Sequence, residues 1–372
     1  MSDITLILLA AGSSNRFELD VKKQWLRIEH KPLWLDLADR CEEMKLFSKI
    51  IITSSLEDIL FMKNYADYTF IEGSSSRQLS LFNALQHVDT EHVIVNDVAR
   101  ACITKEFFQN IISYKNSSDC IVPYLKVTDT IVFENKTIDR DKVKRIQTPQ
   151  LSKTSILKKA LQTKEDFTDE SSAIVANGGN RKFILGDEDA LKITHIQDLK
   201  KLPCLKEVSK DILSGTGFDV HAFGKDKEMF LAGVKIEVDY GFIAHSDGDV
   251  AIHALIDALL GASGMGDIGM LFPDNDETYA GIDSKELLSI VVKKLCNYGF
   301  EIVNIDLSIV AQKPRIAKYK NAMRKKLSSI LNIDMSRVNV KATTTEKLGF
   351  IGRAEGVGVM ANANLKYYDW MK

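Results

Sequence analysis

The chain has 372 residues, of which 45% are hydrophobic and 27% are charged, and its formal net charge at pH 7 is −2. This length exceeds one typical domain, and the composition is that of a globular protein with a buried core. The near-neutral charge excludes a broad surface for nucleic acid, whereas a local phosphate site needs only a few cations.

The first predicted element is the apolar run at residues 5–11, which we interpret as a buried strand. Asp3 precedes it without any Lys or Arg, and the run is too short to span a bilayer, so we expect neither a signal peptide nor a membrane contact. The cysteines are scattered and form no Cys-x-x-Cys pair, which predicts free thiols in a reducing, cytoplasmic compartment. These cysteines are Cys41, Cys102, Cys120, Cys204 and Cys296.

Residues 1–200 alternate runs typical of strands and of helices. An amphipathic stretch at 77–88 predicts a helix, and the charged stretch at 195–211 predicts a terminal helix and connector. This alternation predicts an α/β, Rossmann-like domain with a mainly parallel sheet at residues 1–208. A second domain, α+β and metal-dependent, is predicted at residues 212–372. The strand-like runs of the first domain are 5–11, 49–55, 92–97, 119–127 and 182–187.

A turn rich in small residues, AAGSSNRF at 10–17, directly follows the first predicted strand. Its backbone N–H groups, together with Arg16 and Lys23, are suited to binding phosphates, although such a turn alone is a weak signal. Asp97 ends a second buried strand and Arg100 follows it. The carboxyl ends of strands are where open α/β sheets bind ligands, and a buried unpaired carboxylate would be costly.

The second half carries three candidate metal ligands. Asp219 and His221 form an Asp-x-His pair on a predicted strand, and His253 lies on a predicted helix with Asp249 and Asp257 at spacings of four residues. One carboxylate and two imidazoles suit a divalent cation such as zinc, with one position open to substrate. Each histidine alone is better explained as an ordinary polar group, but the three together favour a metal site.

The first half resembles the family of cytidylyltransferases that act on 2-C-methyl-D-erythritol 4-phosphate. The matching segments are 10–16 with Lys23 and Gln24, 73–80, 96–100, 126–130, 139–140, 148–150, 168–173 and 191–194. The resemblance implies transfer of a cytidylyl group from CTP, with Mg²⁺ on the nucleotide phosphates. It implies catalytic roles for Arg16, Lys23 and Lys192, nucleotide binding by Ala10, Ala11, Gly12, Ser13 and Ser80, and substrate binding by Asp97, Arg100, Thr130, Arg140, Thr148 and Thr168.

The second half resembles the family of 2-C-methyl-D-erythritol 2,4-cyclodiphosphate synthases more closely still. The matching strings are FDVHAF at 218–223, HSDGDVAIHALIDALLG at 245–261, residues 266–274 and residues 340–356. The resemblance implies zinc, or another divalent cation, on Asp219, His221 and His253. It implies catalytic roles for Asp267 and Glu346, nucleotide binding by Arg315, Ala342, Thr343 and Thr344, and substrate binding by His245, Ser246, Asp274, Phe350 and Arg353.

The whole chain therefore resembles the fused bifunctional enzymes of non-mevalonate isoprenoid synthesis. The resemblance implies dimer contacts through the first domain and a trimer through the second, which combine most simply in a hexamer. The kinase that acts between the two reactions is a candidate partner. The alternative reading is a sugar-phosphate nucleotidyltransferase fused to a zinc phosphohydrolase, and another is a first domain that serves only as an oligomerising scaffold.

Overall fold

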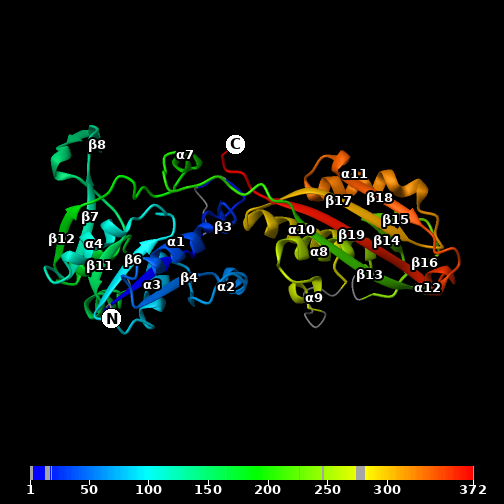
Figure 1. Ribbon diagram of the computed structural model, residues 1–372, viewed down its shortest axis with the longest axis horizontal. Coiled ribbons are helices and arrows are strands. Elements are labelled where there is room, and N and C mark those ends of the chain that lie inside the picture. Colours follow the sequence, from blue (N-terminus) through cyan, green and yellow to red (C-terminus); the bar gives the residue numbers. More distant parts are fainter. Residues whose placement is uncertain are drawn as a thin grey trace. The chain divides into compact units, whose positions relative to one another are not determined.

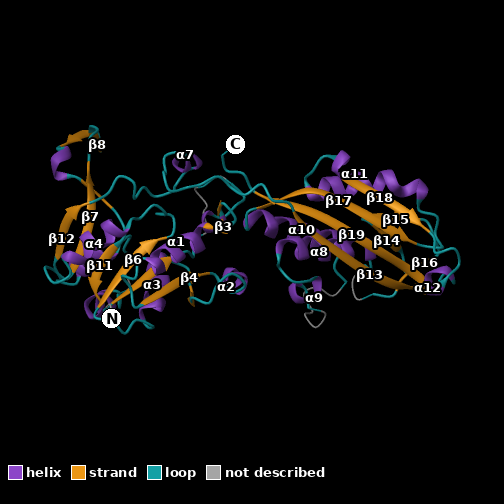
Figure 2. Ribbon diagram, in the orientation of Figure 1, coloured by secondary structure: helices purple, strands orange, loops and turns teal. Residues whose placement is uncertain are grey.

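The computed structural model describes residues 3–12, 17, 19–163, 165–225, 227–244, 247–273 and 281–371. The chain forms two compact units, one of Met1–Val208 with Asp369–Lys372 and the other of Ser209–Tyr368 (Figure 1). Each unit has its own sheet and its own helices (Figure 2). No helix in the described part of the chain combines the length and the apolar composition needed to cross a membrane.

The first unit is built on an eight-stranded sheet with the order β10-β7-β11-β6-β1-β4-β5, in which β12 also pairs with β7. Strands β5, β4, β1 and β6 run parallel, whereas β11 is antiparallel to both of its neighbours. This confirms the predicted α/β fold with a mainly parallel sheet. The strands are β1 Ile4–Leu9, β4 Lys49–Ser54, β5 Thr69–Glu72, β6 His92–Asp97, β7 Cys120–Lys126, β10 Lys144–Ile146, β11 Gln150–Lys153 and β12 Arg181–Leu185.

The helices of this unit are α1 Leu33–Glu43, α2 Leu56–Met62, α3 Arg77–Leu85, α4 Lys105–Ser113, α5 Thr154–Ala160, α6 Glu170–Ala176 and α7 Ile196–Leu199. Two small hairpins, β2 Arg27–Ile28 with β3 Lys31–Pro32 and β8 Ile131–Phe133 with β9 Lys136–Ile138, lie outside the main sheet. The terminal helix and connector predicted over 195–211 are confirmed. The helix is α7, and the chain after it is not helical, because Pro203 lacks the N–H that a longer helix needs.

The order of the strands creates a topological switch point at the centre of this sheet. The connection after β1 leads to β4 on one side of β1, and the connection after β5 returns to β6 on the other side. Leu9 at the end of β1 pairs with Thr53 and with Asp97, and residues 10–12 therefore emerge beside Asp97. Such a switch point leaves a crevice outside the carboxyl ends of the strands.

The second unit has a five-stranded sheet with the order β16-β13-β19-β17-β18, in which helix α8 packs against β13 and β19. The strands are β13 Leu213–Lys225, β16 Tyr240–Phe242, β17 Phe300–Val310, β18 Val338–Thr343 and β19 Gly356–Tyr367, with a separate hairpin of β14 Met229–Leu231 and β15 Val234–Ile236. The helices are α8 Val250–Ser263, α9 Ile268–Leu271, α10 Ser284–Asn297, α11 Lys320–Leu331 and α12 Gly349–Gly352.

Two glycines of β13 let α8 approach the sheet closely. A Cβ atom at Gly215 would lie 2.1 Å from the carbonyl oxygen of Ala258, and one at Gly217 would lie 2.0 Å from that of Ala254. Any side chain at these positions would therefore push the helix away from the strand. The close packing matters because Asp219 lies on β13 and His253 on α8, so these glycines set the distance between them.

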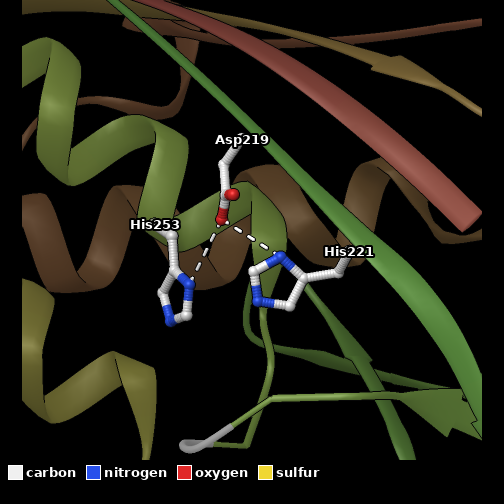
Figure 3. Close-up of side chains that lie close together, drawn as sticks. All are labelled: Asp219, His221 and His253. Carbon is white, nitrogen blue, oxygen red and sulfur yellow. Dashed lines mark ion pairs between the residues drawn. The ribbon is translucent and has the colours of Figure 1, made fainter. Parts of the chain in front are cut away.

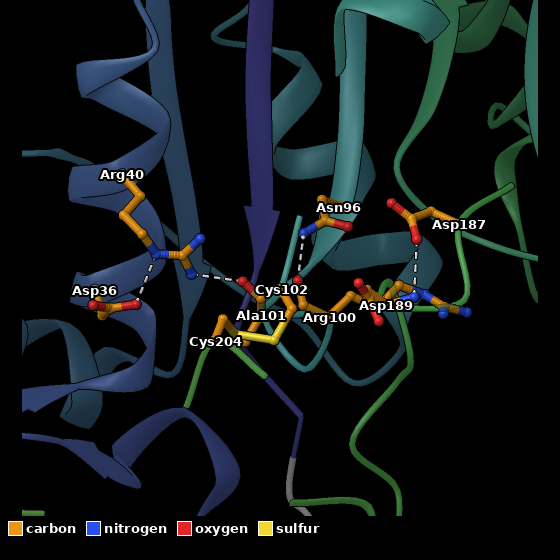
Figure 4. The surroundings of a disulfide bond; sticks show 9 residues. All are labelled: Asp36, Arg40, Asn96, Arg100, Ala101, Cys102, Asp187, Asp189 and Cys204. Atoms are coloured by element: carbon orange, nitrogen blue, oxygen red, sulfur yellow. Dashed lines mark hydrogen bonds and ion pairs between the residues drawn. A yellow bond between two sulfur atoms is a disulfide. The ribbon is translucent and has the colours of Figure 1, made fainter. Parts of the chain in front are cut away.

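The expectation of free thiols is wrong for two cysteines, because Cys102 and Cys204 form a disulfide (Figure 4). The bond joins the loop after β6 to the segment after α7, across 102 positions of sequence. The same loop is held by the Arg40 guanidinium, which donates to the carbonyl oxygen of Ala101 at 2.6 Å. A separation of this size leaves no local pattern in the sequence, so the pair could not be predicted.

Reduction of this disulfide is expected to lower the free energy of unfolding of the first unit by about 2–5 kcal/mol, because the bond closes a long loop in the unfolded chain. Denaturant unfolding with and without a phosphine reductant measures this difference. The Cys102→Ser/Cys204→Ser double variant is the control, since its stability should not respond to reductant. Equal wild-type curves in both conditions would contradict the prediction.

Candidate active sites

A cavity of about 610 Å³ lies at the carboxyl ends of β1 and β6. The structure brings several predicted residues from distant parts of the chain into its wall. Lys23 enters from the short 3-10 helix Lys23–Trp25, and its ammonium group lies 5.3 Å from the centre of the buried Phe17 ring. The predicted residues that line the cavity are Ala10, Ala11, Gly12, Lys23, Ser80, Asp97 and Lys192.

Asp97 is the centre of an ion-pair network at this cavity. Its Oδ1 accepts a hydrogen bond from Nε of Arg77 at 3.1 Å, and its Oδ2 accepts one from Nζ of Lys192 at 2.6 Å. Burial raises the pKa of Asp97, but the charges of Arg77 and Lys192 outweigh burial and hold this pKa well below its usual range. Asp97 is therefore a carboxylate at neutral pH, and it holds the ammonium group of Lys192, which is another lining residue of the cavity.

Arg77 has a second carboxylate partner, which the sequence did not reveal. Its Nη1 donates to Oε1 of Glu170 at 2.7 Å, and Glu170 is buried at the start of α6. Burial raises the pKa of Glu170, and the Arg77 charge opposes that effect. Arg77 thus bridges two buried carboxylates and holds Asp97 in place. Arg77 lies in the matching segment 73–80, but its two partners are 20 and 93 positions away, so no role for it could be predicted from the sequence.

Arg100 and Lys192 also line a second cavity of about 350 Å³. Nη1 of Arg100 donates to the carbonyl oxygen of Ala190 at 2.6 Å, which holds the segment that carries Lys192. Burial lowers the pKa of Arg100, and the Asp97 carboxylate opposes that effect. Thr148 is buried, and its Oγ1 accepts a hydrogen bond from the backbone N–H of Asp97 at 3.4 Å.

The remaining predicted residues of the first unit lie elsewhere. Arg140 is exposed in the 3-10 helix Arg140–Lys142, where its Nη1 donates to the carbonyl oxygen of Thr128 at 2.7 Å. Thr130 and Thr168 are exposed, and neither lines the two cavities described above. Ser13 and Arg16 fall outside the described residues.

The second unit brings Asp219, His221 and His253 together (Figure 3). Residues two apart on β13 share one face, and His253 reaches the same point from α8. Oδ2 of Asp219 lies 3.2 Å from Nδ1 of His221 and 3.3 Å from Nδ1 of His253. The three candidate ligand atoms all lie within 4.8 Å of one another.

The chemistry of this cluster fits a divalent cation. The Nδ1 atom of His221 is buried and makes no hydrogen bond to any residue that the structure describes, although it is close to Asp219. Burial raises the pKa of Asp219, but its interactions with His221 and His253 outweigh burial and hold this pKa well below its usual range. A carboxylate between two imidazole nitrogens is a suitable donor set for zinc.

His253 is oriented by a pair of residues that sequence reasoning missed. Its Nε2 lies 3.0 Å from Oγ of Ser284, and that hydroxyl donates to Oδ1 of Asp247. Because Ser284 holds Nε2, the other ring nitrogen, Nδ1, faces Asp219. Metal-binding histidines are usually oriented in this way by a partner on the nitrogen that does not bind the metal. Asp249 is not part of the cluster. Its carboxylate caps α8 by accepting hydrogen bonds from the backbone N–H groups of Ala251 and Ile252.

The predicted nucleotide segment of the second unit forms the end of β18 and the turn after it. Oγ1 of Thr344 donates to Oε1 of Glu346 at 2.8 Å, and Arg353 pairs with Glu355 at 2.7 Å. Asp267 caps α9 through its contact with the backbone N–H of Met270 at 2.9 Å. Of the other predicted residues, Ala342 and Thr343 lie in β18, Phe350 lies in α12 and Arg315 is exposed, while His245, Ser246 and Asp274 fall outside the described residues.

Comparison with known proteins matches two separate parts of the chain to two family models. Residues 4–203 match the family model of 2-C-methyl-D-erythritol 4-phosphate cytidylyltransferase, and residues 212–366 match that of the YgbB family. The chain is 70% identical to a bifunctional enzyme IspD/IspF of Sulfurimonas denitrificans over 99% of this chain and 96% of that protein. It is 55% identical to the enzyme of the same name from Aliarcobacter butzleri over the full length of both. The structure of the bifunctional IspDF from Campylobacter jejuni has 48% identity and a TM-score of 0.93, with each chain fully covered.

Proposed function

The chain belongs to the family of bifunctional IspD/IspF enzymes, and from this premise we propose which residues carry its two reactions. Its first half is a cytidylyltransferase that converts CTP and 2-C-methyl-D-erythritol 4-phosphate into the CDP-alcohol and pyrophosphate. Its second half is a cyclodiphosphate synthase, which forms the 2,4-cyclodiphosphate and releases CMP. We assign these reactions to residues 1–208 and 212–372.

In the first reaction, a phosphate oxygen of the alcohol attacks the α-phosphorus of CTP, and the bond to the bridging oxygen of pyrophosphate breaks. Both reactants are anions, so catalysis depends on positive charge and on positioning. Lys23 and Lys192 line the larger cavity and would stabilise the charge of the transition state, together with Arg16. The backbone of Gly12 and the Ser80 segment would hold the nucleotide, and Mg²⁺ would enter with its phosphates.

In the second reaction, the 2-phosphate of the substrate attacks the β-phosphorus of its own CDP group, and CMP leaves. A domain of this type uses a divalent metal, and we propose zinc held by Asp219, His221 and His253. Bound zinc would supply a Lewis acid and a template for the β-phosphate. Ser284 and Asp247 keep the His253 ring oriented, while Glu346 and Thr344 would receive the nucleotide end with Mg²⁺.

The convergence of Asp97, Lys192 and Lys23 on one cavity carries the proposal for the first half. Incubation with CTP, Mg²⁺ and 2-C-methyl-D-erythritol 4-phosphate, followed by mass analysis, should yield the CDP-alcohol and pyrophosphate. A panel of sugar phosphates with each nucleoside triphosphate tests the alternative substrate class. For the second half, CDP-methylerythritol 2-phosphate should give the cyclic product, and CMP release without that product would instead indicate a phosphohydrolase.

We propose a hexamer as the assembly, with a trimer as the alternative. Large apolar side chains are exposed in both units: Phe133 of β8 in the first, and the paired residues Phe218 and Met360 of β13 and β19 in the second. Exposed apolar pairs of this kind suit contacts between copies of a chain. A two-fold contact in one unit and a three-fold contact in the other close together in D3 symmetry.

Multi-angle light scattering at micromolar concentration is expected to give the mass of six chains. The Phe133→Asp variant should reduce this mass to three chains, because it places a charge in the proposed two-fold contact and leaves the second unit intact. A stable monomer with full cyclase activity would contradict the proposed assembly.

A further inference from the structure

The smaller cavity of the first unit carries a strong excess of positive charge. Arg100, Arg145 and Lys192 line it, together with His195 and a single carboxylate, Asp198. That carboxylate is already engaged, because its Oδ2 accepts hydrogen bonds from the backbone N–H groups of Thr194 and His195, each at 2.9 Å. The cavity therefore holds more cationic groups than its own acid can balance.

The two arginines of this cavity are not neutralised by an ion pair with a described residue inside it. The Nε atom of Arg100 is buried and has no hydrogen-bond partner among the residues that the structure describes. The guanidinium of Arg145 forms neither a hydrogen bond nor an ion pair with any of them, and its charge acts repulsively on Arg100. Two like charges beside one cavity favour a bound anion.

Arg145 and its neighbour Lys144 on β10 have different surroundings. Lys144 lies over the rings of Tyr124 and Phe183, with its Nζ 5.2 Å from each ring centre, whereas Arg145 lines the cavity. The chain thus offers two adjacent cations on one strand, of which only Arg145 borders the cavity.

Lys192 lines both cavities of the unit, so the two spaces lie on either side of one cationic side chain. The nucleotide is assigned to the larger cavity, and the acceptor must bring a phosphate to the α-phosphorus of that nucleotide. An anion held by Arg100 and Arg145 would approach from the smaller cavity and reach the nucleotide at Lys192. The acceptor carries a phosphate monoester, which an arginine fork binds well.

We infer that Arg145 is a substrate-binding residue that, with Arg100 and Lys192, holds the phosphate group of 2-C-methyl-D-erythritol 4-phosphate. This inference rests on the proposed function of the first unit. It assigns Arg145 to binding and not to the chemical step, because Lys192 lines the nucleotide cavity as well and Arg145 does not.

The test compares Arg145→Gln with Lys144→Gln in the full-length chain. The Arg145→Gln variant is expected to raise the KM for 2-C-methyl-D-erythritol 4-phosphate by roughly 10- to 100-fold, the scale of one lost charged hydrogen bond. Its kcat at saturation and its KM for CTP should remain within about three-fold of wild type, as expected for lost uniform binding. Lys144→Gln should behave as wild type, and Arg145→Lys should fall between the two.

Calorimetric titration of the same variants with 2-C-methyl-D-erythritol 4-phosphate, without CTP, measures binding independently of turnover. A weaker Kd in Arg145→Gln alone supports the inference, and equal affinity in the two glutamine variants would overturn it. Loss of kcat at unchanged KM would also overturn it, since Arg145 would then act on the chemical step. Failure of the wild-type chain to transfer a cytidylyl group would instead refute the proposed function. An unchanged KM for CTP shows that the first unit of each variant is folded.

Discussion

Replacement of His253 by alanine is expected to remove the metal ion and to slow cyclisation by roughly 1000-fold or more, because a bound metal contributes several kcal/mol to such a transition state. The variant keeps only Asp219 and His221 as candidate ligands, and both lie on β13. Two ligands from one strand cannot enclose a cation in the tetrahedral geometry that zinc prefers. The His253 imidazole is the only one of the three groups that α8 contributes.

Elemental analysis of the purified wild-type chain should find about one zinc per chain, and His253→Ala should have almost none. Ser284→Ala is the matched variant, because it removes the partner of Nε2 and keeps all three ligands. It should weaken metal binding by roughly 10- to 100-fold without abolishing it. Cytidylyl transfer should remain normal in both variants. A metal-free wild-type chain with full cyclase activity would refute the assignment.

Much of the fold could be predicted because its signals are local. The β-branched runs of β1, β4, β6 and β7 and the apolar face of α8 each appear within a few consecutive residues. The proximity of Asp219 and His221 could likewise be predicted, because residues two apart on a strand lie on the same face of the sheet. The position of His253 beside that pair depends on the close approach that Gly215 and Gly217 permit, which the sequence alone could only suggest.

The features that escaped prediction are non-local. The Arg77 contact with Glu170 and the Cys102–Cys204 disulfide join positions 93 and 102 residues apart, so no spacing rule reveals them. Arg145 could not be distinguished from Lys144 in a run of charged residues, because β10 is too short to show a pattern of alternation. Its role is visible only when β10 pairs with β7 and the cavity beside it is formed.

Replacement of Lys23 by alanine is expected to slow cytidylyl transfer by at least ~100-fold, the usual effect of losing one charged contact to a transition state. Lys23 lines the nucleotide cavity and lies against the buried Phe17 ring, so its ammonium group is held close to where the phosphates of CTP would lie. The charge on those phosphates grows as pyrophosphate departs. The loss should therefore appear mainly in kcat, while the cyclase activity of the second unit stays unchanged.

The adjacent Lys22 provides the contrast that makes this prediction specific. Its Nζ lies 2.8 Å from Oδ1 of the buried Asp58, which also accepts a hydrogen bond from Gln24. Lys22→Ala leaves that carboxylate with one partner fewer, so it should lower the free energy of unfolding by about 1–3 kcal/mol and change the transfer rate much less. Lys23→Ala should have the opposite profile, with near-normal stability and a large loss of rate. A near-normal rate of cytidylyl transfer in Lys23→Ala would show that Lys23 has no part in the chemistry. The charge on the leaving group would then have to be stabilised by Lys192 and Arg16 alone.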